Sequence, residues 1–184
     1  MIINNLKQNN KKYDIVYADP PWKQKKGGYK KARPKSSGSE LDYPTLSIDD
    51  IKDILSSVST NEKHNFFIWT IDKYLKECED MMKYLGYNLH ARIIWNKVTG
   101  IPAAFTVRYS HEYLLWFYKK GNILKPHKET EGKYSTVFTE QVSRHSKKPI
   151  YAYEMIEDMF RDSEKLELFA RNERKGWDSF GNEL

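Results

Sequence analysis

The chain has 184 residues, of which 39% are hydrophobic and 30% are charged. This is the composition of a globular protein, and the length suits one domain with a sizeable core. The formal net charge of +6 suits a polyanionic partner, but many basic proteins bind no nucleic acid. The bulk numbers therefore exclude a disordered or fibrous chain and leave the partner open.

The residues give little support to metal, disulfide or membrane chemistry. The single cysteine, Cys78, excludes a disulfide within the chain, and the five histidines form no close pair at metal-ligand spacing. No apolar run approaches the roughly 20 residues of a membrane-spanning helix, and the first residues do not form a signal peptide. We therefore expect no metal, no membrane association and a cytoplasmic location.

The first predicted element is a buried strand over residues 15–18, which ends at Asp19-Pro20-Pro21-Trp22. Prolines lack the N–H donor that a central strand needs, so the strand must end there. In open α/β sheets the ligand crevice lies outside the carboxyl ends of the strands. The tetrapeptide is therefore expected to place a carboxylate, two rigid carbonyls and an aromatic ring at a crevice.

Helix and strand patterns alternate after the tetrapeptide. Ser47 and Asp50 form a helix start, and Gly86 is a helix stop. The pattern predicts helices over 47–58, 72–85 and 149–160, and strands over 65–70, 89–95, 112–118 and 165–170. This alternation indicates one α/β domain over residues 1–184 with a largely parallel sheet.

Two long stretches break the alternation. Residues 23–40 are rich in Lys, Arg, Gly and Ser and include seven basic residues, while residues 122–144 are polar and irregular. Loops of this length in compact domains are usually lids, binding loops or disordered. We therefore predict a basic active-site loop over 23–40 and a second mobile loop over 122–144.

The tetrapeptide resembles the catalytic motif of amino methyltransferases that use S-adenosylmethionine to methylate adenine N6 in nucleic acid. The resemblance implies that Asp19, Pro20, Pro21 and Trp22 are catalytic. The Asp19 carboxylate and the Pro20 carbonyl would accept the two N–H bonds of the amine, Pro21 would limit movement, and Trp22 would stack on the base. The alternative is a plain strand-ending turn with Trp22 packed in the core.

The similarity continues over nearly the whole chain in the same order. Residues 43–47, 66–70, 93–97 and 111–116 resemble segments of the adenine-N6 methyltransferases typified by the catalytic subunit of the eukaryotic mRNA enzyme and its bacterial and phage relatives. In this family the catalytic strand comes first and the cofactor strand last. The resemblance therefore implies a Rossmann-like methyltransferase fold with a circularly permuted order of motifs.

The last third of the chain resembles the family's binding site for S-adenosylmethionine. Lys148, directly before Pro149, resembles a lysine that binds the donor's carboxylate at a helix start, where the helix dipole also favours an anion. Without the resemblance, Lys148 would be a solvated basic cap. The implied donor-binding residues are Asp19, Lys148, Phe169, Arg171, Asn172, Asn182 and Glu183.

The basic loop follows Trp22 directly, so its charge is expected at the mouth of the site. Lysines there would bind phosphates, and Tyr29 and Arg33 could stack on an unpaired base. The alternative is a solvated, disordered loop. The predicted nucleic-acid-binding residues are Lys23, Lys25, Lys26, Tyr29, Lys30, Lys31, Arg33 and Lys35.

Together these features predict an S-adenosylmethionine-dependent adenine-N6 methyltransferase that acts on nucleic acid. The compact form resembles bacterial or mobile-element members more than mRNA enzymes, which favours DNA. An RNA adenosine methyltransferase and a catalytically inactive nucleic-acid-binding partner remain alternatives, although inactive members usually lack the Asp or the Trp. Cytosine-N4 enzymes usually carry Ser in place of Asp19. A homodimer or a heterodimer would both be compatible with the family.

Overall fold

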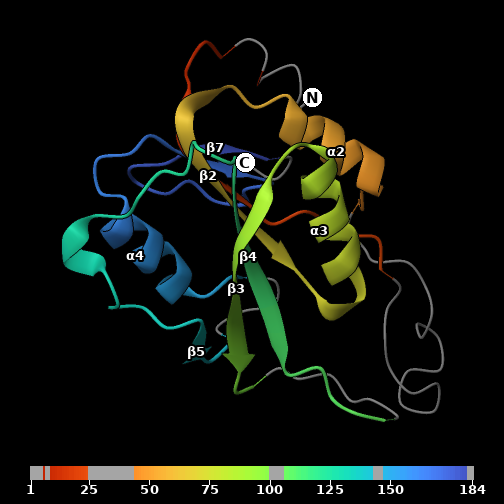
Figure 1. The fold of residues 1–184 in the computed structure, drawn as a ribbon. Helices are drawn as coiled ribbons and strands as arrows, with labels where there is room; N and C mark the ends of the chain where they lie inside the picture. Colours follow the sequence, from red (N-terminus) through yellow and green to blue (C-terminus); the bar gives the residue numbers. More distant parts are fainter. Residues whose placement is uncertain (1–5, 7–8, 25–43, 100–105, 143–146, 182–184) are drawn as a thin grey trace.

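The computed structural model describes residues 6, 9–24, 44–99, 106–142 and 147–181, which form one seven-stranded sheet with helices on both faces (Figure 1). The strands are β1 (Tyr13–Ala18), β2 (Thr60–Thr70), β3 (Asn88–Lys97), β4 (His111–Tyr118), β5 (Val137–Glu140), β6 (Lys165–Leu168) and β7 (Asp178–Phe180). The helices are α2 (Ile48–Ser56), α3 (Leu75–Tyr84) and α4 (Ile150–Met159), with 3₁₀ turns η1 (Asp72–Tyr74) and η2 (Lys128–Thr130).

The strands lie in the order β5-β3-β4-β2-β1-β6-β7. Strand β4 runs antiparallel to β2 and β3, and the other neighbouring pairs are parallel. The predicted Rossmann-like α/β fold with a largely parallel sheet is therefore confirmed. The chain continues from β1 toward β2 and from β6 toward β7, in opposite directions across the sheet. Such a reversal is where open α/β sheets bind ligands.

The helices divide the core into two layers. Helices α2 and α3, orange and yellow-green in Figure 1, cover one face of the sheet, and α4, in blue, covers the other. On the α2 and α3 side, Val16 and Leu166 pack with Ile51 and Met82. On the α4 side, Tyr17 packs with aromatic side chains from β2, β3 and β4. Both faces of β1 are therefore buried, as a central parallel strand requires.

Local signals set the helix ends as expected. The Ser47 hydroxyl accepts the Asp50 N–H, and the Asp50 carboxylate accepts the Ser47 N–H, which completes a capping box for α2. After α3, Gly86 adopts φ +85°, the left-handed conformation that glycine tolerates without strain. The predicted start of α2 and the predicted stop of α3 are both confirmed.

Three expectations about strands need correction. Strand β6 ends at Leu168 and not at Ala170, because Phe169 takes φ +62° and turns the chain. Strand β7 was not predicted, since three residues give no periodicity. Residues 122–144 were expected to be irregular, and this is wrong for the residues of β5. This strand forms by pairing with β3, although only Phe138 of its four residues is buried. Movement of the rest of that segment stays a prediction.

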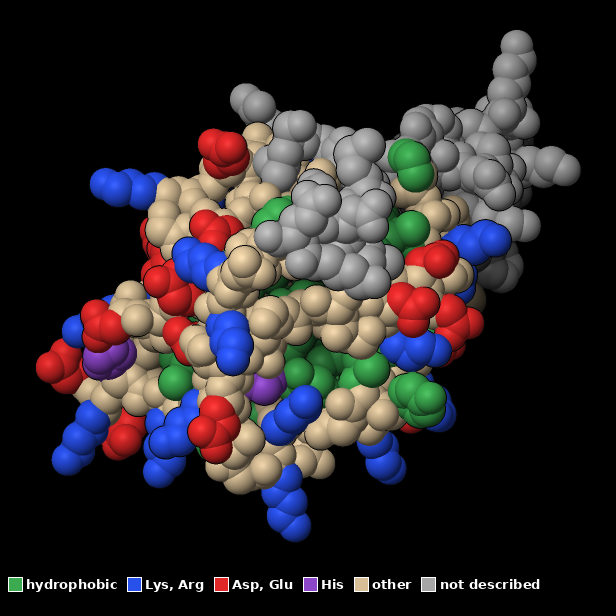
Figure 2. Space-filling view, turned by 90° about the horizontal axis from the view of Figure 1, so that it is seen from above, with side chains coloured by type: hydrophobic (Ala, Val, Ile, Leu, Met, Phe, Trp, Pro, Cys, Tyr) green, Lys and Arg blue, Asp and Glu red, His purple; other side chains and the backbone are tan. Residues whose placement is uncertain are grey.

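Positive charge is spread over the surface. Figure 2 views the end of the sheet at which β2 begins, and lysine and arginine side chains project there among acidic ones. Lys63 at the start of β2, and Lys119 and Lys120 after β4, are exposed. The net charge of the chain therefore does not by itself locate a binding face.

Two kinds of feature are absent from the described part of the chain. No helix there is long and apolar enough to cross a membrane. No three His, Cys, Asp or Glu side chains of the described ranges come together as a potential metal site.

Candidate active site

The tetrapeptide leaves the carboxyl end of β1 in a tight turn. The Trp22 N–H donates to the Pro20 carbonyl at 2.8 Å, which closes a three-residue turn around Pro21, and the Leu46 N–H donates to the Pro21 carbonyl at 3.0 Å. The proline rings fix φ within this turn. The carboxylate of Asp19 is therefore held at the carboxyl end of β1, where the Asp19 side chain is 25% exposed to solvent.

Lys148 lies directly against Asp19. Its Nζ is 3.0 Å from Asp19 Oδ1 and 2.8 Å from Glu112 Oε2, and Lys97 pairs with the other oxygen of Glu112. The Lys148 ammonium also lies 5.1 Å above the Trp69 ring. Four charges of alternating sign thus meet at the end of the sheet where β1 and β3 end. Two predicted site residues, Asp19 and Lys148, are brought together from positions far apart in the chain.

Burial and pairing set the charges of this cluster. Burial raises the pKa of the Asp19 carboxyl, and the Lys148 ammonium only partly opposes this effect. Burial would also favour neutral Glu112, but Lys148 and Lys97 lower its pKa below the ordinary value. Burial disfavours charged Lys148, yet the two carboxylates raise its pKa. Asp19 is therefore more basic than an ordinary aspartate, because its pKa is raised, and Lys148 keeps its positive charge.

Glu112 and Lys97 were not predicted as site residues. Both lie at the same end of the sheet: Lys97 ends β3, and Glu112 lies near the start of the antiparallel β4. Both appeared in the sequence only within segments that resemble the family. That resemblance was the signal that could have identified them.

Trp22 does not present a free face to a base in this structure. The side chain is only 4% exposed, its ring stacks on Tyr74 at 5.3 Å, and its Nε1 donates to the Trp69 carbonyl at 3.0 Å. The expectation of base stacking on Trp22 is therefore not met here, and the core-packing alternative describes its position. The reason is that Tyr74, at the end of η1, occupies the stacking position.

The first amides of α4 are already bonded to an acid. Ile150 N–H donates to Glu140 Oε1 at 2.8 Å, and Tyr151 N–H donates to Glu140 Oε2 at 3.0 Å. A carboxylate at a helix start satisfies unpaired N–H groups and the helix dipole. Glu140 is therefore an anion that the dipole at the start of α4 already favours in this structure, and binding of the donor's carboxylate by Lys148 stays a prediction.

The predicted donor-binding segment begins beside Asp19. Ala18 in β1 is opposite Leu168 in β6, so Asp19 and Phe169 follow neighbouring strands at the same edge. Phe169 holds a left-handed φ, and such strain persists only where the surroundings enforce it. Burial raises the pKa of Asp19, and the positive charge of Arg171, on the loop after Phe169, slightly opposes this effect. Asn172 is exposed on the same loop.

Several predicted residues cannot be placed. Asn182 and Glu183 lie outside the described residues, as do the loop residues Lys25, Lys26, Tyr29, Lys30, Lys31, Arg33 and Lys35. Lys23 is described and exposed, and its carbonyl accepts hydrogen bonds from the Tyr74 hydroxyl and the Lys73 ammonium. The entry into the basic loop is therefore tied to η1.

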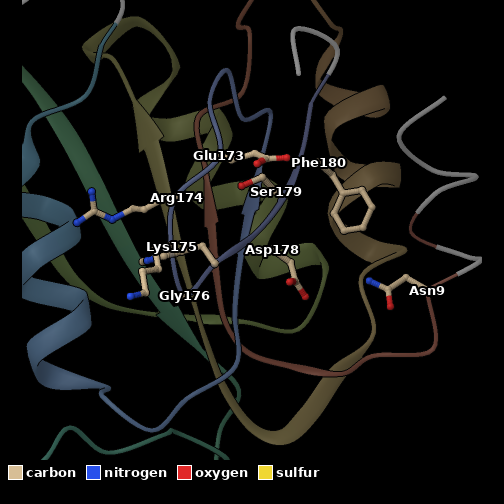
Figure 3. A pocket seen from close by; sticks show the side chains of 9 residues that line it. Asn9, Glu173, Arg174, Lys175, Gly176, Asp178, Ser179 and Phe180 are labelled. Atoms are coloured by element: carbon tan, nitrogen blue, oxygen red, sulfur yellow. The ribbon is translucent and has the colours of Figure 1, made fainter.

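A hollow of about 810 Å³ lies along β7, next to the donor-binding segment (Figure 3). Residues 173–180 and Asn9 line it, and neither Asp19 nor Lys148 does. Its lining includes Asp178, whose carboxylate pairs with Lys11 at 2.9 Å, but the Lys11 side chain is 40% exposed, against 14% for Lys148. The charged cluster, and not this hollow, therefore marks the chemistry.

The residues at the edge fit the functional groups of S-adenosylmethionine. Lys148 has three N–H donors and uses two on carboxylates, so one remains for an anionic group. Asp19 supplies the negative charge that suits a cationic donor.

Gly181 lies directly against Ala170. At Gly181, a Cβ atom would lie 1.8 Å from the Ala170 carbonyl oxygen, so only glycine lets these two chain segments approach so closely.

Comparison with known proteins places this site in a family. The chain is 31% identical to the type II methyltransferase M.MunI of Mycoplasma sp, over 95% of this chain and 78% of that protein. It is 28% identical to the human N(6)-adenosine-methyltransferase catalytic subunit METTL3 and 26% identical to an MT-A70-like N(6)-adenosine-methyltransferase of Arabidopsis thaliana. The chain spans only 28% and 24% of those two proteins. A family model described as MT-A70 matches residues 13–183, and the chain therefore belongs to the MT-A70 family.

Proposed function

We propose that the protein transfers a methyl group from S-adenosylmethionine to the N6 amine of adenine in nucleic acid, with DNA as the favoured polymer. The observation that carries this proposal is the contact of Asp19 with Lys148 at the carboxyl end of β1, next to the turn at Phe169. An acceptor for an amine and a cation for a carboxylate are thereby held side by side.

The residues at this edge can orient an amine. The Asp19 carboxylate accepts one N–H, and the Pro20 carbonyl, which already accepts the Trp22 N–H, has a second lone pair for the other. Two acceptors on one amine direct its nitrogen lone pair away from them. Adenine's amine is a weak nucleophile because its lone pair is delocalised into the ring, so this positioning is the main task of the site.

The bound donor supplies a methyl group activated on a sulfonium sulfur. Lys148 would hold the donor's carboxylate, while Glu112 and Lys97 hold Lys148 in place. The amine nitrogen must lose one proton when it gains the methyl group. Asp19 can accept this proton, and the raised pKa of its carboxyl makes it a better base than an ordinary aspartate.

The similarity to the type II methyltransferase M.MunI supports DNA as the polymer. Most of the type II methyltransferase M.MunI matches this chain, whereas the N(6)-adenosine-methyltransferases are several times longer. The basic residues of the predicted loop suit the phosphates of either polymer. An RNA adenosine methyltransferase is the second candidate, favoured by the similarity to those longer relatives.

One experiment tests the base, the position and the polymer together. The purified protein is incubated with methyl-labelled donor and single-stranded DNA, duplex DNA or RNA, and the nucleosides are analysed by mass spectrometry. We expect N6-methyldeoxyadenosine. Methylated RNA alone would overturn the preference for DNA, and methylated cytosine or no methylation at all would overturn the proposed reaction.

A matched pair of variants tests the role of Asp19 in the same assay. At saturating donor, Asp19→Ala should lower the rate by about 10²–10⁴-fold, as loss of an acid–base group does. Asp53→Ala removes an exposed carboxylate of α2 and should leave the rate unchanged. Full activity of Asp19→Ala would remove this carboxylate from the mechanism.

A further inference from the structure

Glu157 in α4 accepts three hydrogen bonds from the connection between β6 and β7. Arg174 Nε and Nη2 donate to its two carboxylate oxygens at 2.6 and 2.8 Å, and Trp177 Nε1 donates to Oε1 at 2.7 Å. In Figure 3 the Arg174 side chain extends toward α4. A bidentate arginine–carboxylate pair sets both distance and orientation. We call these three residues the Glu157 clamp.

The clamped connection contains two of the predicted donor-binding residues, Arg171 and Asn172. Its first part is held by the Ala170 N–H, which donates to the Phe180 carbonyl at 3.1 Å, and by the close approach of Gly181 to Ala170. Its last part, up to the start of β7, has its side chains bound to α4 through the clamp. The strained backbone at Phe169 needs such support from both ends.

The clamp also relates this connection to Lys148. Helix α4 begins two residues after Lys148 and carries Glu157 near its end. A shift of α4 as a unit would therefore move Glu157 and also the helix start that follows Lys148. The clamp therefore fixes the position of Lys148 relative to the 169–177 connection, although Lys148 and Arg174 are in different parts of the sequence.

A second contact joins the clamp to the central strands. The Arg174 guanidinium lies 4.7 Å above the Tyr153 ring, and the Tyr153 hydroxyl donates to Glu167 Oε1 at 2.7 Å. Glu167 is in β6, opposite Tyr17 in β1. Glu167 lies two residues before Phe169, and Tyr17 lies two residues before Asp19.

We infer that Glu157 is a positioning residue which, through Arg174 and Trp177, holds the 169–177 connection and Lys148 in the arrangement that binds the methyl donor. This inference rests on the proposed function, since it takes S-adenosylmethionine as the ligand. Glu157 contacts neither donor nor substrate in this role. It holds the site in its binding conformation before the donor arrives, which lowers the free-energy cost of ordering these residues on binding.

Donor affinity is the measurement that tests the clamp. Calorimetric titration with S-adenosylmethionine should show Glu157→Gln binding about ten-fold more weakly than the wild type, because Gln has one acceptor oxygen in place of two, so at least one of the three hydrogen bonds is lost and the others no longer have an ionised acceptor. The rate at saturating donor should stay within about two-fold, since the variant affects binding and not the chemical step. Glu154→Gln, at an exposed position of the same helix, is the matched control and should bind the donor normally.

A second variant separates positioning from folding. Arg174→Lys keeps the charge but cannot form the bidentate pair, and it should weaken donor binding with little change in unfolding temperature. When Glu157→Gln and Arg174→Lys are combined, the loss of binding free energy should be smaller than the sum of the two single losses, because both changes break the same interaction. A purely structural role would instead lower the unfolding temperature and leave donor affinity in the folded protein unchanged, which would overturn the inference.

The outcomes distinguish this inference from the proposed function. If the wild type binds no S-adenosylmethionine, the proposed function fails. If the wild type binds it and both variants bind it equally well, the clamp has no positioning role and the proposed function still stands.

Discussion

The two faces of the central strands differ in chemistry. On the α2 and α3 side, β1 and β6 present only apolar side chains toward their carboxyl ends, namely Val16, Ala18, Leu166 and Leu168, and the Tyr13 hydroxyl lies at the opposite end of β1. On the α4 side the same strands present a hydroxyl and a carboxylate. There Tyr17 accepts the Trp69 Nε1–H at 2.5 Å, and Glu167 accepts the Tyr153 hydroxyl.

Strand geometry links the polar face to the active site. Side chains alternate between the two faces of a strand, so Asp19 continues the row that contains Tyr17. Lys148 reaches Asp19 from the start of α4, on the same side. The α2 and α3 face therefore serves as scaffold, whereas the α4 face carries the groups that set charge and position at the site. Changes on the two faces should consequently affect different properties.

The largest expected effect on stability comes from the apolar face. Ile51 is fully buried between α2 and the sheet. Ile51→Ala should lower the free energy of unfolding by about 2–5 kcal/mol, through lost burial and a residual cavity. Denaturant titration measures this loss. Methyl transfer by the folded variant at low temperature should remain near the wild-type rate.

Val137→Ala is the control for this change, because it removes the same kind of group from a half-exposed position in β5. It should alter the free energy of unfolding by less than about 0.5 kcal/mol. If Ile51→Ala abolished methyl transfer while the protein stayed folded, the division into scaffold and functional face would be wrong.

The next effect comes from the α4 side. Lys148→Ala leaves the carboxylates of Asp19 and Glu112 without the cation between them and removes the proposed partner of the donor's carboxylate. Donor affinity measured by calorimetry should fall by about 10–100-fold, which corresponds to loss of one buried charge-assisted contact. Lys147→Ala, at the exposed neighbouring position, should have no such effect. Unchanged donor affinity in Lys148→Ala would exclude this residue from the binding site.

Much of the fold could be predicted because its signals are local. The apolar run before Asp19, the capping box at Ser47 and the stop at Gly86 each depend on a few neighbouring residues, and each prediction is confirmed. Strands β5 and β7 are different, because each is too short for a periodic pattern and forms by pairing with a distant strand. Their existence depends on tertiary contacts.

The site was predictable only in part, for the same reason. The sequence identified Asp19 and Lys148 through motifs. It could not show that Glu112 and Lys97 complete the cluster, because their contacts join separate strands. The environment of Trp22 depends on Tyr74, which lies far along the chain and covers the ring. A tryptophan that packs in a core and one that stacks on a base look alike in sequence.

The smallest predicted effect tests the polar face through pH. Burial raises the pKa of Glu167 to about 7 in the folded protein, against 4.5 for an ordinary glutamate. Between these two values the folded state holds a proton that the unfolded state has lost, so this group makes the protein less stable as pH rises. The lowered pKa of His64, caused by its burial, makes the protein more stable as pH rises, so the effect of Glu167 must be measured by comparing a variant with the wild type.

The wild type should lose free energy of unfolding between about pH 5.5 and pH 7.5, and Glu167→Gln should reduce this loss by on the order of 1 kcal/mol, measured by denaturant titration at both pH values. Glu154→Gln should leave that difference as it is in the wild type, and an unchanged difference in Glu167→Gln would show that the α4 face does not hold this carboxyl protonated.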